Sequence, residues 1–99
     1  MNIQAMMKQA QKLQQDMMKT KGEIDVKIFP GKYSFASVEV NGKKELLKVN
    51  IDKNIDLTKE DIEMLEDILV LAVNDALKKV DVELESKMGK YGSGMSGLF

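Results

Sequence analysis

The sequence predicts an α+β protein of the order helix, three antiparallel strands, long helix, which pairs as a two-fold homodimer with projecting helical arms. The apolar residues change period twice: they are spaced by three and four in the first part of the chain, by two in the middle, and again helically after residue 58. Ninety-nine residues suffice for one domain but not for two. We therefore expect a single domain over residues 1–88, followed by a flexible Gly- and Ser-rich tail over 89–99.

The first predicted helix carries a narrow apolar seam of the kind found in coiled coils. Its members alternate spacings of three and four residues: Ile3, Met6, Ala10, Leu13 and Met17. A helix this short needs another apolar surface, provided either by the long helix of its own chain or by the same arm of a second copy. Gly22 is expected to end the helix.

The middle of the chain has the pattern of strands. Alternation over residues 23–28 predicts the first strand, which Pro30 and Gly31 are expected to end. The next two strands are joined by Asn41 and Gly42, a strong signal for a two-residue type I′ hairpin that would pair Val40 with Lys43. This register places one set of apolar side chains on a common face: Ala36, Val38, Val40, Leu47, Val49 and Ile51.

The last predicted helix, Lys59 to Met88, begins after Thr58 as N-cap, with Asp61 in a capping-box position. Between residues 68 and 73 it is apolar in every direction around its axis, whereas one small sheet shields only one face. A second copy is the simplest cover. The expected dimer interface consists of Ile68, Leu69, Val70, Leu71 and Val73.

The composition removes the usual residues of most enzyme chemistries. The chain has no cysteine and no histidine, which excludes the common zinc sites and histidine-activated nucleophiles. No phosphate-binding glycine loop precedes a helix. We therefore expect no catalytic residue, no metal site, no cofactor and no small-molecule substrate.

The apolar runs are too short for a membrane segment. The longest, residues 68–73, falls far below the roughly 20 residues that a membrane-spanning helix needs. The N-terminus is rich in Gln and Lys and does not resemble a secretory signal. A cytoplasmic protein without membrane contact is expected.

Several segments resemble the YbaB/EbfC family of nucleoid-associated proteins. The resemblance is carried by residues 63–77 of the long helix, by the hairpin at 38–42, and by 7–12, 49–52 and 87–89. The stretch 29–35 departs from the Gly-rich approach to the hairpin that the family often has. The resemblance implies a homodimer that binds double-stranded DNA in the nucleoid, organises or alters its conformation, and influences gene expression.

Positive charge is local. The net charge is only −1, but residues 1–54 hold ten lysines against six acids, and residues 55–99 hold five against ten. The candidate phosphate contacts are Lys8, Lys12, Lys19, Lys21, Lys43, Lys44, Lys78 and Lys79. The first three lie away from the apolar seam, and a merely solvated helix face is the alternative interpretation.

Two functions follow from these features. Binding of duplex DNA through lysines would be weak and largely tolerant of sequence, because the chain has no arginine, the commonest bidentate reader of guanine. The alternative is a protein-interaction adaptor that uses methionine-rich, coiled-coil-like arms and binds no nucleic acid. Nuclease treatment distinguishes the two, since only a protein partner would survive it.

Overall fold

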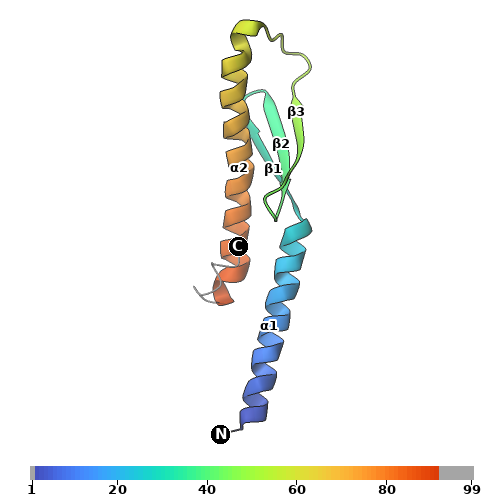
Figure 1. The fold of residues 1–99 in the computed structure, drawn as a ribbon, viewed down its shortest axis with the longest axis vertical. Coiled ribbons are helices and arrows are strands. Elements are labelled where there is room, and N and C mark those ends of the chain that lie inside the picture. Colours follow the sequence, from blue (N-terminus) through green and yellow to red (C-terminus); the bar gives the residue numbers. More distant parts are fainter. Residues whose placement is uncertain (1, 92–99) are drawn as a thin grey trace.

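The computed structural model describes residues 2–91, and its elements follow the predicted order (Figure 1). The three strands form one antiparallel sheet in the order β1-β2-β3. The α+β class and the order helix, three strands, long helix are confirmed. The bounds are α1 Ile3–Val26, β1 Ile28–Tyr33, β2 Ala36–Asn41, β3 Leu46–Ile51, a 3₁₀ turn Lys59–Asp61, α2 Ile62–Met88 and a final 3₁₀ turn Gly89–Tyr91.

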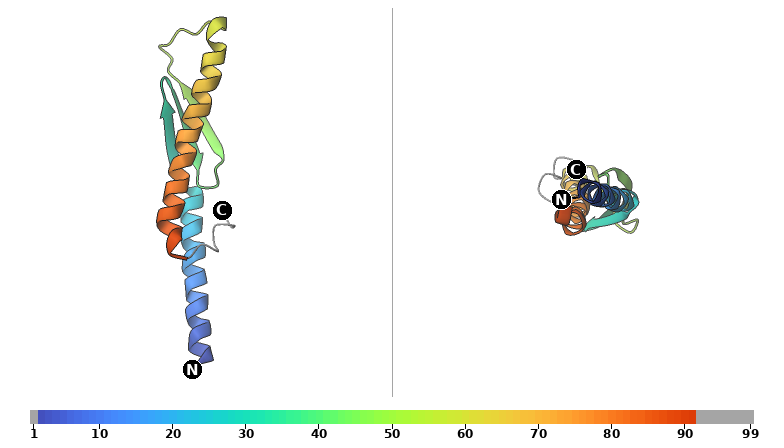
Figure 2. Two further views of the ribbon diagram at one scale, coloured as in Figure 1. Left: turned by 90° about the vertical axis from the view of Figure 1, so that its left-hand side faces the viewer. Right: turned by 90° about the horizontal axis from the view of Figure 1, so that it is seen from below.

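The chain forms a rod rather than a globule. Its extents are 71 × 20 × 15 Å and its radius of gyration is 19.3 Å, against about 13 Å for a compact domain of this length. Helix α2 lies along the sheet, and α1 continues the long axis beyond it (Figures 1 and 2). The first half of α1 stands clear of the other elements, and its seam residues Ile3, Met6 and Leu13 are exposed. The predicted projecting arm is therefore present in a single chain.

The boundary between α1 and β1 differs from the prediction. Gly22 does not end the helix, which continues to Val26, so the strand expected over residues 23–28 is wrong except for Ile28, where β1 begins. Ile24 explains the difference, because from the last turn of α1 it packs into the core at 3% exposure. Pro30 and Gly31 lie within β1 instead of ending it. A proline fits here because β1 is an edge strand, paired only with β2.

Gly31 brings the sheet into direct contact with α2. A Cβ atom at this position would lie 2.4 Å from the carbonyl oxygen of Ala72 and 2.6 Å from the backbone nitrogen of Ala76. Both alanines are fully buried. Three small residues thus allow a strand backbone to lie against a helix backbone, and no side chain fits between them.

Helix α2 is buried at every fourth residue along most of its length. Such a row moves around the helix by about 40° per step, because a turn holds only 3.6 residues. The first half of the row faces the sheet, and the second half turns toward α1, from which Ile24 and Met17 pack against the same core. One helix therefore serves two partners. The row consists of Ile68, Ala72, Ala76, Val80, Leu84 and Met88.

Two side chains of α2, one turn apart, bind the outer edge of β1. Asp75 Oδ2 accepts a hydrogen bond from the backbone nitrogen of Lys32 at 3.0 Å, and Lys79 Nζ donates to the carbonyl oxygen of Pro30 at 2.7 Å. The two side chains also form an ion pair of 3.6 Å. These bonds occupy backbone groups that would otherwise be open to another strand, so β3 remains as the open edge of the sheet.

The register between β2 and β3 corrects the predicted hairpin. Ala36 pairs with Ile51 and Val38 with Val49, and residues 42–45 form a longer connection than the expected two-residue turn. The predicted pairing of Val40 with Lys43 is therefore wrong. From Ala36 to Glu39 the pairing is displaced by an even number of residues, so the partners there keep the common face that the alternation predicts. A register shift between Glu39 and Val40 then pairs Val40 with Leu46, so the predicted face does not continue to Val40 and Leu47.

The tight turn lies elsewhere, between β1 and β2. Tyr33 pairs with Ala36 across a two-residue loop, in which Ser34 adopts a left-handed φ of 53°. Gly42 is needed for a different reason: a Cβ there would lie 1.9 Å from the carbonyl oxygen of Ile24. The Asn-Gly pair thus marks a close approach to the end of α1 and not a type I′ turn.

The predicted start of the long helix is confirmed. The backbone nitrogen of Thr58 donates to Asp61 Oδ2 at 2.9 Å in a capping box, and the 3₁₀ turn leads directly into α2. The Thr58 hydroxyl donates to Glu60 Oε2 at 2.9 Å, and this bond lowers the pKa of Glu60.

At the C-terminal end of α2, residues 89–91 form a turn whose Tyr91 packs against the core. The rest of the predicted tail, residues 92–99, lies outside the described residues.

Candidate nucleic-acid interface

The projecting arm presents three lysines on one face. At 100° per residue, Lys8, Lys12 and Lys19 fall within a sector of about 40°, opposite the apolar seam. All three are exposed. The chain has no acidic residue before Asp16, so most of the arm carries no carboxylate. Before Asp16 the arm therefore offers a polyanion a cationic face without a competing negative charge, whereas Lys19 has Asp16 and Glu23 one helical turn away.

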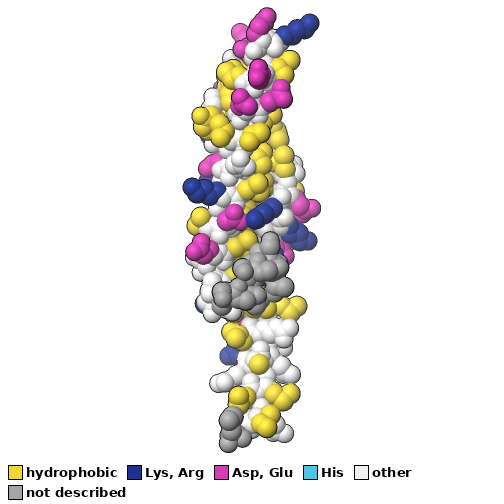
Figure 3. Space-filling view, turned by 60° about the vertical axis from the view of Figure 1, so that its left-hand side comes forward, with side chains coloured by type: hydrophobic (Ala, Val, Ile, Leu, Met, Phe, Trp, Pro, Cys, Tyr) yellow, Lys and Arg dark blue, Asp and Glu magenta, His cyan; other side chains and the backbone are white. Residues whose placement is uncertain are grey.

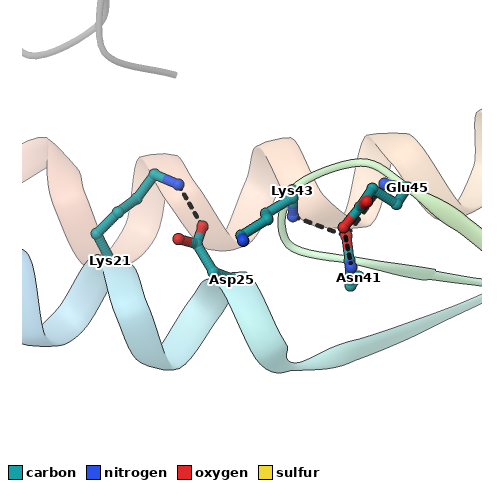
Figure 4. Close-up of polar contacts among 5 residues, drawn as sticks. All are labelled: Lys21, Asp25, Asn41, Lys43 and Glu45. Carbon is teal, nitrogen blue, oxygen red and sulfur yellow. Dashed lines mark hydrogen bonds and ion pairs between the residues drawn. The ribbon is translucent and has the colours of Figure 1, made fainter.

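At the base of the arm, two candidate lysines are engaged within the chain. Lys21 forms an ion pair with Asp25 one turn further along α1 (Figure 4). Lys44 Nζ lies 2.7 Å from Asp81 Oδ1 of α2, which ties the β2–β3 connection to the long helix. Contact of these ammonium groups with phosphate would compete with the ion pairs.

The side chain of Asn41 closes the β2–β3 connection with hydrogen bonds to residues of the loop. Its Oδ1 accepts hydrogen bonds from the backbone nitrogens of Lys43 at 2.9 Å and Glu45 at 3.0 Å, and its amide donates to Glu45 Oε1 at 2.7 Å (Figure 4). The exposed Lys43 side chain has no ion-pair partner within residues 2–91. It is the one candidate of this loop whose ammonium group is available.

The candidates on α2 also differ from each other. Lys79 binds Pro30 and Asp75 as described above. Lys78 is exposed and borders an open groove beside Phe29 and Val82. Of the eight lysines, those without an ion-pair partner in the described part of the chain are Lys8, Lys12, Lys19, Lys43 and Lys78.

Negative charge gathers at the end of the rod opposite the arm. Acidic side chains crowd the start of α2 and gather at the upper end of the surface in Figure 3, beside a cationic side chain. Their negative charges interact favourably with the positive, N-terminal end of the α2 dipole. They also repel polyanions from this end of the rod. The rod therefore carries positive charge on its arm and negative charge at its opposite end. The residues concerned are Glu60, Asp61, Glu63, Glu66 and Asp67.

A contact that the sequence does not predict joins the base of the arm to α2. Lys27, the residue between α1 and β1, donates to Glu83 Oε2, and its Nζ lies 5.4 Å from the centre of the Phe29 ring. The bond from Lys27 lowers the pKa of Glu83. The two residues are 56 positions apart, and no local pattern in the sequence signals such a pair.

We expect Lys27→Gln to raise the pKa of Glu83 toward its ordinary value. Since the folded-state pKa is lowered, the pair stabilises the junction at pH values above the ordinary carboxyl pKa, and this stabilisation is lost as pH falls through the lowered pKa. A carbon NMR titration of the Glu83 carboxylate measures the midpoint. Lys8→Gln on the arm is the control and should leave it unchanged; equal midpoints in all three proteins would refute the coupling.

The residues expected at the dimer interface occupy different environments in the single chain. Ile68 lies in the chain's own core, and Leu69 and Val73 are half-buried against it. Val70 and Leu71 remain 58% and 44% exposed. On β3, the apolar side chains of Leu46, Leu47 and Val49 are also about half exposed. Figure 3 shows apolar side chains running along the boundary between α2 and the sheet.

Among residues 2–91, no group of three or more carboxylates is arranged to hold a metal ion. No helix within the same range has the length and apolar character needed to cross a bilayer.

Comparison with known proteins supports one interpretation of this surface. The model of the YbaB/EbfC DNA-binding family matches residues 1–95. A nucleoid-associated protein of Clostridium novyi is 44% identical over 100% of this chain and 90% of its own length. Nucleoid-associated proteins of Lactococcus lactis subsp. cremoris, at 41% identity over 96% of this chain and 97% of theirs, and of Ligilactobacillus salivarius, at 38% over 99% and 95%, are similar along their length.

Proposed function

Since the chain belongs to the YbaB/EbfC DNA-binding family, we propose that it acts as a homodimeric nucleoid-associated protein that binds duplex DNA through its projecting arms. The observation that carries the proposal is the arm itself. Lys8, Lys12 and Lys19 share one face of an exposed helix that has no carboxylate before Asp16. Such a surface neutralises phosphates regardless of the net charge of the whole chain.

The second copy is proposed to cover the apolar side of α2 and β3. Val70 and Leu71 point away from the chain's own core, and β3 is the open edge of the sheet. A radius of gyration well above that of a compact domain also indicates surface that a single chain leaves uncovered. Pairing there would bring two arms into one particle. Once one arm binds a duplex, the second arm is held at a high effective concentration near the same duplex, which raises the overall affinity.

The binding is expected to be largely insensitive to sequence. Phosphate contacts position a protein on DNA and carry no direct sequence information. The chain lacks arginine throughout, so the commonest bidentate contact to guanine is missing. A protein of this kind would organise or alter the conformation of DNA at many sites, and any effect on gene expression would follow from that.

The test is the salt dependence of binding to unrelated duplexes. We expect Lys8→Gln/Lys12→Gln to weaken binding and to make the negative slope of log K against log salt shallower, by about 0.9 for each phosphate that the variant no longer neutralises. Fluorescence anisotropy over a salt series measures both quantities. The matched control is Lys53→Gln/Lys59→Gln, which removes equal charge near the acidic end. Absence of binding at low salt, or equal slopes in both double variants, would contradict the proposal.

One observation favours the alternative function, a protein-interaction adaptor. The arm exposes several methionines besides its seam, among them Met7 and Met18, and flexible thioether side chains adapt to varied protein surfaces. A stoichiometric protein partner that stays bound after nuclease treatment, together with absent DNA binding at low salt, would support the adaptor instead.

A further inference from the structure

We infer that glutamines on the arm contact adenine in the major groove and give the protein a modest preference for A·T-containing duplexes. This inference rests on the proposed DNA-binding function and adds a specific contact to it. The preference is superimposed on phosphate binding that is otherwise tolerant of sequence.

The glutamines are confined to the arm. All five in the chain lie between residues 4 and 15, and none occurs elsewhere. Every residue of α1 from Ile3 to Asp16 is exposed. No described element of the chain covers this segment, and no carboxylate precedes Asp16. Up to Gln15, the segment therefore reaches a ligand with neutral and cationic side chains alone.

Helical geometry places three glutamines beside the lysines. With 100° per residue, Gln4, Gln11 and Gln15 share a sector of about 100° with Lys8 and Lys12. The apolar seam lies on the opposite side and stays available for another helix. One face thus combines groups that bind phosphate with amides that can bind base edges.

The chemistry selects the base. A glutamine amide pairs with adenine in the major groove, where its oxygen accepts from the N6 amino group and its nitrogen donates to N7. The major groove, about 12 Å wide, admits a single α-helix. In the minor groove, A·T and T·A pairs present only acceptors and are not distinguished. Since the chain contains no arginine and lysine binds as a flexible point charge, these amides are the arm's planar side chains able to pair with a base edge at two points.

The experiment compares duplexes in which one acceptor of adenine is removed at a time. At fixed low salt, 7-deazaadenine lacks N7 in the major groove, and 3-deazaadenine lacks N3 in the minor groove. We expect the first substitution to weaken binding about fivefold for each adenine that a glutamine reads, which corresponds to the lower range of a bidentate base contact. The second substitution should have no effect.

Two arm variants locate the glutamines responsible. Gln4→Ala/Gln11→Ala/Gln15→Ala should abolish the difference between adenine and 7-deazaadenine duplexes while keeping the salt slope. Gln14→Ala, on the flank next to the seam, is the control and should retain the difference. Alanine has a higher helix propensity than glutamine, so the arm remains helical in each variant.

The outcomes separate this inference from the proposed function. Binding that is salt-dependent but equal for adenine and 7-deazaadenine overturns the adenine contact and leaves the DNA-binding function standing. Weaker binding to the 3-deazaadenine duplex instead would place the arm in the minor groove and also overturn the inference. Absence of binding to every duplex at low salt would refute the proposed function itself.

Discussion

Replacing Gly31 with valine is expected to lower the free energy of unfolding by about 3 kcal/mol or more. The Cβ atom alone, without the rest of the valine side chain, would lie 2.4 Å from the Ala72 carbonyl oxygen. The atoms that it meets are mostly backbone atoms of α2, which cannot turn aside as a flexible side chain does. The sheet and the helix would have to separate, and the buried row of α2 would no longer pack against β1.

Urea denaturation followed by circular dichroism measures this effect, with all proteins at the same chain concentration because association contributes to stability. Gly22→Ala is the control. Gly22 lies within α1, and nothing lies within 4 Å of the added methyl group. Alanine should stabilise the helix there by about 0.5–1 kcal/mol. A Gly31→Val protein as stable as the parent would show that the sheet does not rest directly on α2.

Three glycines of the folded region illustrate which parts of the fold the sequence predicts. Local pattern predicts a helix end at Gly22, a strand end at Gly31 and a turn at Gly42. In the structure, Gly22 lies within α1 with free space around it. At Gly31 and Gly42, by contrast, another backbone lies so close that only glycine fits. The local sequence pattern gives no information about contacts between distant segments. It therefore predicts neither the boundaries of β1 nor the hairpin register.

The longer elements are predicted correctly because their signals are repeated many times. The apolar spacing of α2 persists over six turns or more, and its capping box marks one defined start. The common face of Val38 and Val49 is correct despite the wrong register, since alternation fixes the face while the turn fixes the pairing. Periodicity therefore predicts the faces of the elements better than their ends.

The candidate site divides in the same way. The arrangement of Lys8, Lys12 and Lys19 on one face follows from helix periodicity and could be predicted. The engagement of Lys44 with Asp81 depends on a contact between distant segments and could not. The sequence thus identifies lysines that are able to bind phosphate, whereas the structure separates those already paired from those without an ion-pair partner.

Val70→Glu is expected to convert the proposed dimer to monomers by raising its dissociation constant about a hundredfold or more. Val70 is 58% exposed in the single chain, so a charge there is hydrated in the monomer and costs little. In the dimer it would be buried without a partner, at a cost of about 3 kcal/mol or more. A two-fold interface contains the substitution twice, which increases the penalty.

Sedimentation velocity at micromolar concentration measures the association. Val82→Glu is the matched control: Val82 lies on the same helix and is 59% exposed, yet it is outside the proposed interface. It should remain dimeric. A parent protein that sediments as a folded monomer, or a Val70→Glu protein that stays dimeric, would refute the proposed interface. If the interface is correct, the monomeric variant keeps one arm per particle, so its DNA affinity should fall and its salt slope should decrease to about half.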